Sequence, residues 1–219
     1  MRDIAAVDLA SMLCSRLCHD MLSPIGALSN GLELLADEDD PAMREKCIEL
    51  LEQSAKTSAD KLKFFRLAFG AAGGFGEMVP IEEPHQLIEA LASGNSRITL
   101  NWATPERTMP KAAIKVLLNF AQMAIDALVR GGTLDIGAET REGASEIVVR
   151  ATGDRIAFDD AIGKALQGEL EPDEITSRTA AAHMIALLAE EQGGGLQFKK
   201  SEGALVLGAV LPMPQGLIG

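Results

Sequence analysis

The chain has 219 residues, 47% of them hydrophobic, so it is long enough and apolar enough to bury one or two cores. Acidic residues outnumber lysine and arginine by 32 to 20, and the net charge of −12 argues against nucleic acid and anionic membrane surfaces as partners. Aromatic residues make up only 4% of the chain, which argues against a surface on which bases stack.

The number of cysteines and the length of the apolar runs indicate in which cellular compartment the protein resides. Cys14, Cys18 and Cys47 are odd in number, so they cannot form a closed disulfide framework, and they suit a reducing cytoplasm. No apolar run reaches the length of a membrane span, and the first residues lack a signal-peptide pattern. We therefore expect a soluble, cytoplasmic protein.

Two amphipathic helical patterns fill the first 70 residues. The first covers about residues 3–36 and places its apolar residues on one arc. Asp40 followed by Pro41 predicts the start of a second helix, which extends to about Phe69. A connection of about five residues makes the pair an antiparallel hairpin. The apolar arc of the first helix consists of Leu9, Leu13, Leu17, Met21, Leu28, Leu32 and Leu35, and the stripe of the second consists of Leu51, Ala55, Ser58, Leu62, Phe65 and Phe69.

The apolar stripe of the second helix steps by four and by three residues, as in a coiled coil. Two helices alone cannot cover such long seams. We therefore expect residues 1–70 to form a four-helix bundle with a second copy, which makes the protein a homodimer. The alternative is a monomer in which the C-terminal half covers the hairpin.

Glycines cluster after the hairpin at Gly70, Gly73, Gly74 and Gly76, which predicts a linker over residues 71–80. Residues 81–219 then alternate between helical and strand patterns. We expect helices near residues 84–92, 110–129, 158–167 and 176–192, and strands near 97–102, 133–138, 146–152, 196–200 and 204–211. This order predicts an α/β sandwich with helices on one face of a mixed sheet, and an α+β class for the whole chain.

His19 is the histidine whose setting indicates chemistry. It projects about 180° from the centre of the apolar arc, so it points to solvent, and Ser15 and Ser23 lie within about 40° of it. Pro24 lies inside the same helix, at a cost of roughly 3 kcal/mol, and leaves the carbonyl of Asp20 without its usual donor. Sequences keep such interruptions mainly at functional positions.

An exposed imidazole can accept a phosphoryl group. One ring nitrogen attacks, while the other needs a hydrogen-bond acceptor that fixes the tautomer, and Asp20 is a candidate for that role. Because the phosphoryl donor must approach in line, we expect His19 to stand on an open, convex surface and not in a cleft.

The other polar candidates have ordinary explanations. His85, near the start of a helix, is expected to be a surface or capping residue. His183, inside a helix that packs on the sheet, is expected to be a hydrogen-bonded histidine at the edge of the core. Arg16, one turn before Asp20, could steer a phosphorylated partner or only solvate its helix.

Zinc is a second possible chemistry, because Cys14, Cys18 and His19 are close on one helix. Both cysteines project toward the edge of the apolar arc, where a buried thiol behaves as a small hydrophobe. No fourth ligand has a suitable spacing. We therefore expect no bound metal.

The segment His19-Asp20-Met21-Leu22-Ser23-Pro24 resembles the phosphoacceptor box of sensor histidine kinases. The resemblance implies that His19 is phosphorylated, that Asp20 is its acidic neighbour, and that Ser23 faces the partner regulator. Ser15, Arg16 and Pro24 are expected at the same partner surface.

Residues 81–219 also resemble the ATP-binding domain of these kinases in element order, and residues 117–127 are similar to its asparagine box. Met123 stands at the position of the magnesium-binding asparagine, and a thioether is a poor ligand for that cation. Ala151 replaces the adenine-binding aspartate, Arg155 replaces a glycine, and residues 179–182 lack the second glycine box. We expect no ATP binding.

A phosphoacceptor without a nucleotide site resembles the ChpT-type histidine phosphotransferases. The resemblance implies that the receiver domain of a hybrid histidine kinase phosphorylates His19, which passes the group to response regulators, typically a cell-cycle transcription factor and a regulator of proteolysis. The receiver would hold Mg²⁺, so the chain itself is expected to bind no cofactor, and residues 81–219 are expected to dock receivers. The alternatives are an active histidine kinase, which would label itself from ATP, and a scaffold that docks receivers without accepting phosphate.

Overall fold

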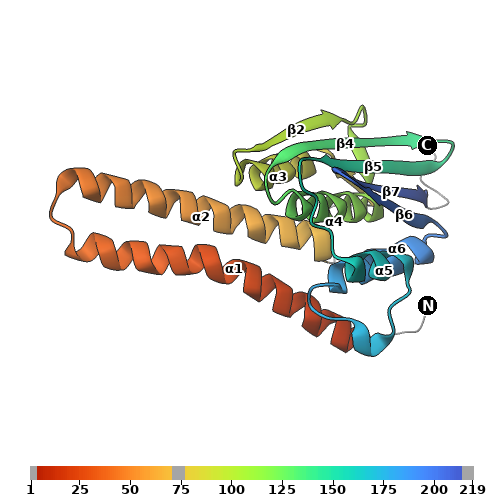
Figure 1. The fold of residues 1–219 in the computed structure, drawn as a ribbon, viewed down its shortest axis with the longest axis horizontal. Coiled ribbons are helices and arrows are strands. Elements are labelled where there is room, and N and C mark those ends of the chain that lie inside the picture. Colours follow the sequence, from red (N-terminus) through yellow and green to blue (C-terminus); the bar gives the residue numbers. More distant parts are fainter. Residues whose placement is uncertain (1–3, 71–76, 214–219) are drawn as a thin grey trace.

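The computed structural model describes residues 4–70 and 77–213, which form a long helical hairpin joined to an α/β sandwich (Figure 1). The predicted hairpin consists of α1 (Ala6–Asp37) and α2 (Pro41–Phe69). The Asp40 side chain caps α2, since one of its carboxylate oxygens accepts from the backbone N–H groups of Ala42 and Met43 at 2.8 and 3.2 Å. The hairpin prediction is confirmed.

The two apolar arcs predicted for the hairpin are each divided in the structure. Leu51 faces α1 so closely that a Cβ added at Gly31 would lie 2.8 Å from its side chain. Leu62 and Leu32, placed on the same arcs by the sequence, are instead 51% and 60% exposed. From the sequence, one hairpin alone was not expected to cover both apolar stripes, and this exposure in the single chain is what that expectation implies, because a pair of helices buries only the seam between them.

The sandwich contains a five-stranded mixed sheet in the order β2-β4-β5-β7-β6, in which only the β2–β4 pair is parallel. Its helices lie together on one side of the sheet, as the sequence predicts (Figure 1). Side chains alternate between buried and exposed along most strands, which is the pattern of a sheet covered on one face. The strands are β2 (Ile98–Ala103), β4 (Gly132–Arg141), β5 (Ala144–Thr152), β6 (Gly195–Ser201) and β7 (Ala204–Pro212), and the helices are α3 (Glu82–Ser93), α4 (Lys111–Ala127), α5 (Asp160–Gln167), the short η1 (Pro172–Glu174) and α6 (Ala180–Glu191).

Two short strands were missed by the sequence analysis. β1 (Met78–Pro80) pairs antiparallel with β3 (Thr108–Pro110), and Val79 and Met109 on them are fully buried. Residues 78–80, predicted as linker, therefore belong to the sandwich. Residues 71–76, with three of the predicted linker glycines, lie outside the described residues.

The hairpin and the sandwich share one hydrophobic core. Phe64, Phe65, Leu67 and Ala68, in the last two turns of α2, are buried in the same cluster as the residues of α4, and Met21 of α1 joins them. The predicted boundary at residue 70 therefore does not separate two cores. Within residues 4–70 and 77–213, no helix has both the length and the apolar character needed to cross a bilayer.

Two histidines lie in the sandwich. His85 of α3 stacks on Trp102 of β2 with ring centroids 4.3 Å apart, so it packs against the sheet. His183 of α6 is completely buried, and neither ring nitrogen has a hydrogen-bond partner among the described residues. The prediction of a hydrogen-bonded His183 at the core edge is wrong. Burial lowers its pKa below the ordinary value of 6.5, because a charged imidazole would be desolvated there.

Replacing His183 with leucine should stabilise the protein, since an unpaired buried polar group costs about 1 kcal/mol or more. The gain should grow as the pH falls below 6.5, because the unfolded wild-type chain then binds a proton that the folded chain does not. At most, the difference in the free energy of unfolding between the two proteins should increase by about 1.4 kcal/mol for each unit by which the pH falls. Urea unfolding of both proteins at pH of about 7.5 and about 5.5 would measure this, and an equal difference at both values would contradict it.

Candidate functional site

His19 stands on the outward face of α1, as the sequence predicts, with 86% of its side chain exposed. Its Nδ1 lies 3.2 Å from the Oδ1 of Asp20. An ionised carboxylate can only accept a hydrogen bond, so the contact favours the tautomer in which Nδ1 carries the hydrogen. Nε2 then keeps its lone pair and faces solvent. The structure thus distinguishes the two ring nitrogens, which the sequence could not do.

Arg16 connects this pair to the sandwich. Its Nε lies 3.7 Å from the second oxygen of Asp20, its Nη2 lies 3.6 Å from the Oδ2 of Asp126 in α4, and its Nη1 donates to the carbonyl of Arg178 at 3.3 Å. Only 17% of the Arg16 side chain is exposed. The sequence left two roles open for Arg16, partner steering and solvation of its helix, but in the structure it joins α1 to two segments of the sandwich.

Asp126 completes this group of charges. The surrounding protein raises the pKa of Asp126 above its ordinary 3.8 by desolvation, while the hydrogen bond from Gln122 and the charge of Arg16 oppose the rise. Gln122 Nε2 donates to its Oδ1 at 2.8 Å. The nearby carboxylate of Asp20 adds to the rise, so two acidic groups share one guanidinium here.

Pro24 is buried, and α1 continues through it for three more turns. The Asp20 carbonyl, which loses the backbone N–H of residue 24, accepts instead from the Nζ of Lys61 at 3.0 Å. The sequence predicted the missing donor but not the replacement, because Lys61 lies on α2, 41 residues away. An ammonium group from the opposite helix thus compensates for the proline.

A groove of about 430 Å³ separates the His19 face of α1 from the sandwich. Its lining includes the largely buried apolar side chains of Met123 and Phe158 together with charged groups of both signs. The predicted convex surface is therefore wrong on this side, although His19 itself remains open. The lining consists of Ser15, Arg16, His19, Asp20, Met123, Asp126, Ala157, Phe158, Asp159, Ile162, Ser177 and Arg178.

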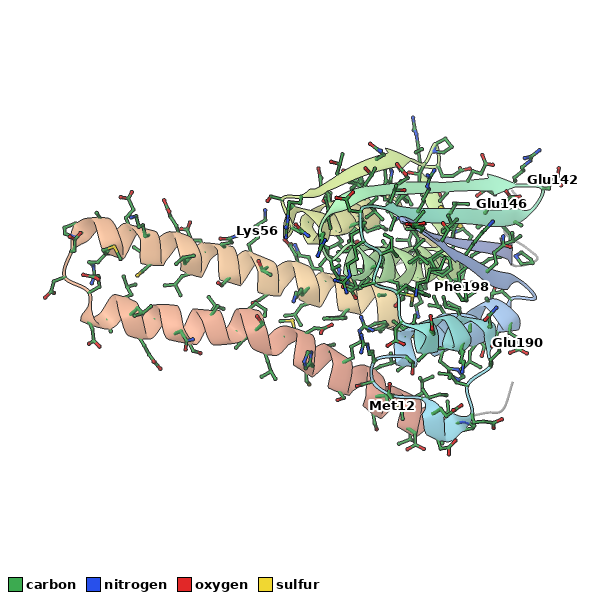
Figure 2. The ribbon with its side chains drawn as sticks, in the orientation of Figure 1. Met12, Lys56, Glu142, Glu146, Glu190 and Phe198 are labelled. Atoms are coloured by element: carbon green, nitrogen blue, oxygen red, sulfur yellow. The ribbon has the colours of Figure 1, made fainter. Side chains whose placement is uncertain are left out.

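The N-terminal half of α1 packs against the sandwich. Met12, labelled near the N-terminal end of α1 in Figure 2, packs on the shared core, as does Leu17.

Of the predicted site residues, the groove brings together Ser15, Arg16, His19 and Asp20. Ser23 is exposed and Pro24 is buried, and neither lines the groove.

The residues that the sequence analysis aligned with the kinase nucleotide-binding motifs differ in their location and burial. Met123 contributes a thioether to the groove wall, where an oxygen ligand would be needed for Mg²⁺. Ala151 is fully buried on β5, and Arg155 is exposed in the following loop. Residues 180–182, which replace the glycine box, are buried in the first turn of α6.

Cys14 and Cys18 are exposed, so the prediction that they are buried as small hydrophobes is wrong within one chain. Among residues 4–70 and 77–213, no group of three histidine, cysteine or acidic side chains is arranged to hold a metal ion.

Asp126, Asp159, Arg178 and Lys61 were missed by the sequence analysis. Asp126, Asp159 and Arg178 line the groove beside His19, and Lys61 reaches the Asp20 carbonyl from α2. Each is brought there only by tertiary packing, from a segment at least 41 residues away in the chain. Nothing in the local sequence around them marks this proximity.

Comparison with known proteins identifies relatives over most of the chain. Residues 81–204 match the family model for the histidine phosphotransferase C-terminal domain. Protein phosphotransferase ChpT from Brucella abortus (strain 2308) is 32% identical over 194 residues, which cover 87% of this chain and 89% of that protein. A 1.7 Å structure of a bacterial phosphotransferase superposes with a TM-score of 0.82 at 28% identity, covering 95% of this chain and 98% of that one.

The compensation at Pro24 can be tested with a double-mutant cycle. Lys61→Met should lower the free energy of unfolding by about 1 kcal/mol, because the Asp20 carbonyl loses its donor. In a Pro24→Ala background the N–H of residue 24 is restored, so the same substitution should cost only about 0.3 kcal/mol. Lys63→Met, an exposed lysine on the same helix, is the matched control. Equal costs for Lys61→Met in both backgrounds would refute the interpretation.

Proposed function

The chain belongs to the histidine phosphotransferase family of ChpT, and on that premise we propose that it carries a phosphoryl group on the Nε2 atom of His19 between receiver domains. The observation that carries this proposal is the contact of His19 Nδ1 with the Asp20 carboxylate, which leaves Nε2 as a free and exposed nucleophile. The family assignment agrees with the resemblance found in the sequence.

Transfer to the chain proceeds by in-line displacement. The lone pair of Nε2 attacks the phosphorus of a receiver's aspartyl phosphate, the bond from phosphorus to the carboxylate oxygen breaks, and an Nε2–P bond forms. The ring becomes positively charged while Nδ1 keeps its hydrogen, and the Asp20 carboxylate beside Nδ1 stabilises that charge. Transfer to a second receiver reverses these steps. Mg²⁺, which the receiver and not this chain would hold, would supply neutralisation of the charge on the phosphoryl oxygens.

We propose that the phosphoryl group does not come from ATP bound to this chain. Met123 offers a soft thioether where a hard cation needs oxygen, and the side chain of Ala151 has no group to accept a hydrogen bond from the adenine amino group. The donor is instead the receiver domain of a hybrid histidine kinase. The acceptors are response regulators, which by the sequence resemblance include a cell-cycle transcription factor and a regulator of proteolysis.

The groove beside His19 is the surface proposed to dock these receivers. It combines apolar side chains with the cation of Arg178, whose side chain is 74% exposed even though its Nε lies 3.5 Å from the Oδ2 of Asp159. A receiver whose active site approaches Nε2 would cover this groove, and its acidic residues would find a complementary charge in Arg178. In this proposal, residues 81–204 function in docking receiver domains and not in binding a nucleotide.

A three-component relay tests the function: a phosphorylated donor receiver, this protein and a second receiver. We expect the wild-type protein to acquire an acid-labile label and pass it on, with a ³¹P NMR signature of phosphate on Nε2. His19→Gln should abolish both steps because it removes the nucleophile. Incubation with ATP alone should give no label. Label from ATP would indicate an active kinase, and transfer supported by His19→Gln would indicate a scaffold.

The same assay tests docking. Arg178→Glu should raise the receiver concentration needed for half-maximal transfer by about tenfold while the rate at saturation changes little. Lys199→Glu on the exposed face of β6 is the matched charge reversal away from the groove. Equal effects of the two substitutions would exclude the groove as the docking surface.

We also propose that the chain is a homodimer through its hairpin. On α1 an outward seam consists of Leu22, Ile25 and Leu32, at spacings of three and seven residues. On α2 a second seam consists of Ile48 and Leu62, which are fourteen residues, or two heptads, apart. All five are at least 45% exposed in the single chain. Such seams are stable in water when a second hairpin covers them, as in a four-helix bundle.

Replacing Ile25 and Leu62 together with glutamate should convert the dimer to a monomer, because each dimer would bury four unpaired carboxylates. Light scattering after gel filtration would measure the mass. Leu50→Glu is the control, since Leu50 is 60% exposed but lies off the seam of α2. A monomeric wild-type protein at micromolar concentration would disprove the proposal.

A further inference from the structure

Four side chains form an unbroken series from α4 to the phosphoacceptor. Asp126 contacts Arg16 at 3.6 Å, Arg16 contacts Asp20 at 3.7 Å, and Asp20 contacts His19 at 3.2 Å. The series joins the sandwich to the hairpin across 110 residues of sequence. It differs from an ordinary surface ion pair because the guanidinium at its centre is mostly enclosed and holds three partners, including the Arg178 carbonyl.

The division of Arg16 between two carboxylates has a chemical consequence. A guanidinium facing one carboxylate tends to bind both of its oxygens through two parallel N–H groups. In this structure the Nε of Arg16 faces the Oδ2 of Asp20, while its Nη2 faces Asp126. The Oδ1 atom of Asp20 therefore remains available to the Nδ1 of His19.

We propose that Asp126 and Arg16 are positioning residues: together they hold the Asp20 carboxylate so that His19 keeps the tautomer with a free Nε2. The sandwich thus takes part in transfer through Asp126, in addition to any contact with partners. This inference rests on the proposed function for its effect on transfer, but its effect on the ring can be measured separately.

Substitutions of Asp126 and Arg16 should disturb the Asp20 carboxylate in different ways. With Asp126→Asn, Arg16 is released to bind both oxygens of Asp20 and competes with His19 for Oδ1. With Arg16→Gln, the carboxylate loses its anchor and rotates freely. Arg16→Lys restores a cation to the same place without the two-pronged geometry, so it should recover part of the effect of Arg16→Gln.

The experiment combines ¹⁵N NMR of the histidine rings with the rate of transfer from a phosphorylated receiver. His19 is assigned by comparison with His85→Gln and His183→Gln. We expect Asp126→Asn and Arg16→Gln to shift the His19 ring nitrogens toward a mixture of tautomers and to slow transfer by roughly tenfold. Glu83→Gln is the matched control, because it breaks another ion pair between hairpin and sandwich, with Arg66 at 3.1 Å, outside the groove lining.

The outcomes are distinguishable. Unchanged ring shifts in both variants overturn the inference, even if transfer slows, because the residues would then act on the partner. A ring response equal to that of Glu83→Gln also overturns it, since the effect would be general loosening of the two parts. If His19 of the wild-type protein accepts no phosphate but its ring responds as expected, the proposed function fails and the positioning role stands.

Discussion

The arrangement of this protein depends on the hydrophobic core that the hairpin shares with the sandwich. The end of α2 inserts Phe64, Phe65, Leu67 and Ala68 beside α4, and Met21 attaches α1 to the same cluster. Burial of these side chains supplies a few kcal/mol each, much more than any of the nearby exposed ion pairs. The core therefore fixes the distance between α1 and the sandwich, and the polar contacts adjust the side chains within it.

The site that results is polar and shallow. The Asp20 carboxylate beside the imidazole favours one tautomer, and in our proposal the Arg16 guanidinium, which also contacts the sandwich, holds that carboxylate in one orientation. Lys61 donates a hydrogen bond to the backbone carbonyl of Asp20, which Pro24 would otherwise leave without a donor. All of these groups act around a side chain that stays exposed, which suits an acceptor that must meet large partners.

The groove between α1 and the sandwich combines apolar and charged side chains. Met123 and Phe158 contribute apolar surface to it, and the Met123 thioether would be a poor ligand for a hard cation such as Mg²⁺. Such a surface is suited to contact with a protein. The five-stranded sheet behind it supplies rigidity, since α4 packs across the sheet with one face almost entirely buried.

Periodicity and capping were enough to predict the hairpin, the outward direction of His19, the helices and the five main strands, because these depend on residues within a few turns of one another. Resemblance of the six residues from His19 to Pro24 to a phosphoacceptor box, together with the altered nucleotide motifs at Met123, Ala151 and Arg155, predicted the family. The sequence could not divide the apolar arcs into two seams, identify β1 and β3, or show that His183 lacks a partner. Nor could it connect Arg16, Lys61 and Asp126 to the site. Those features depend on which distant segments meet, and that is decided by packing of the whole core and not by any local pattern.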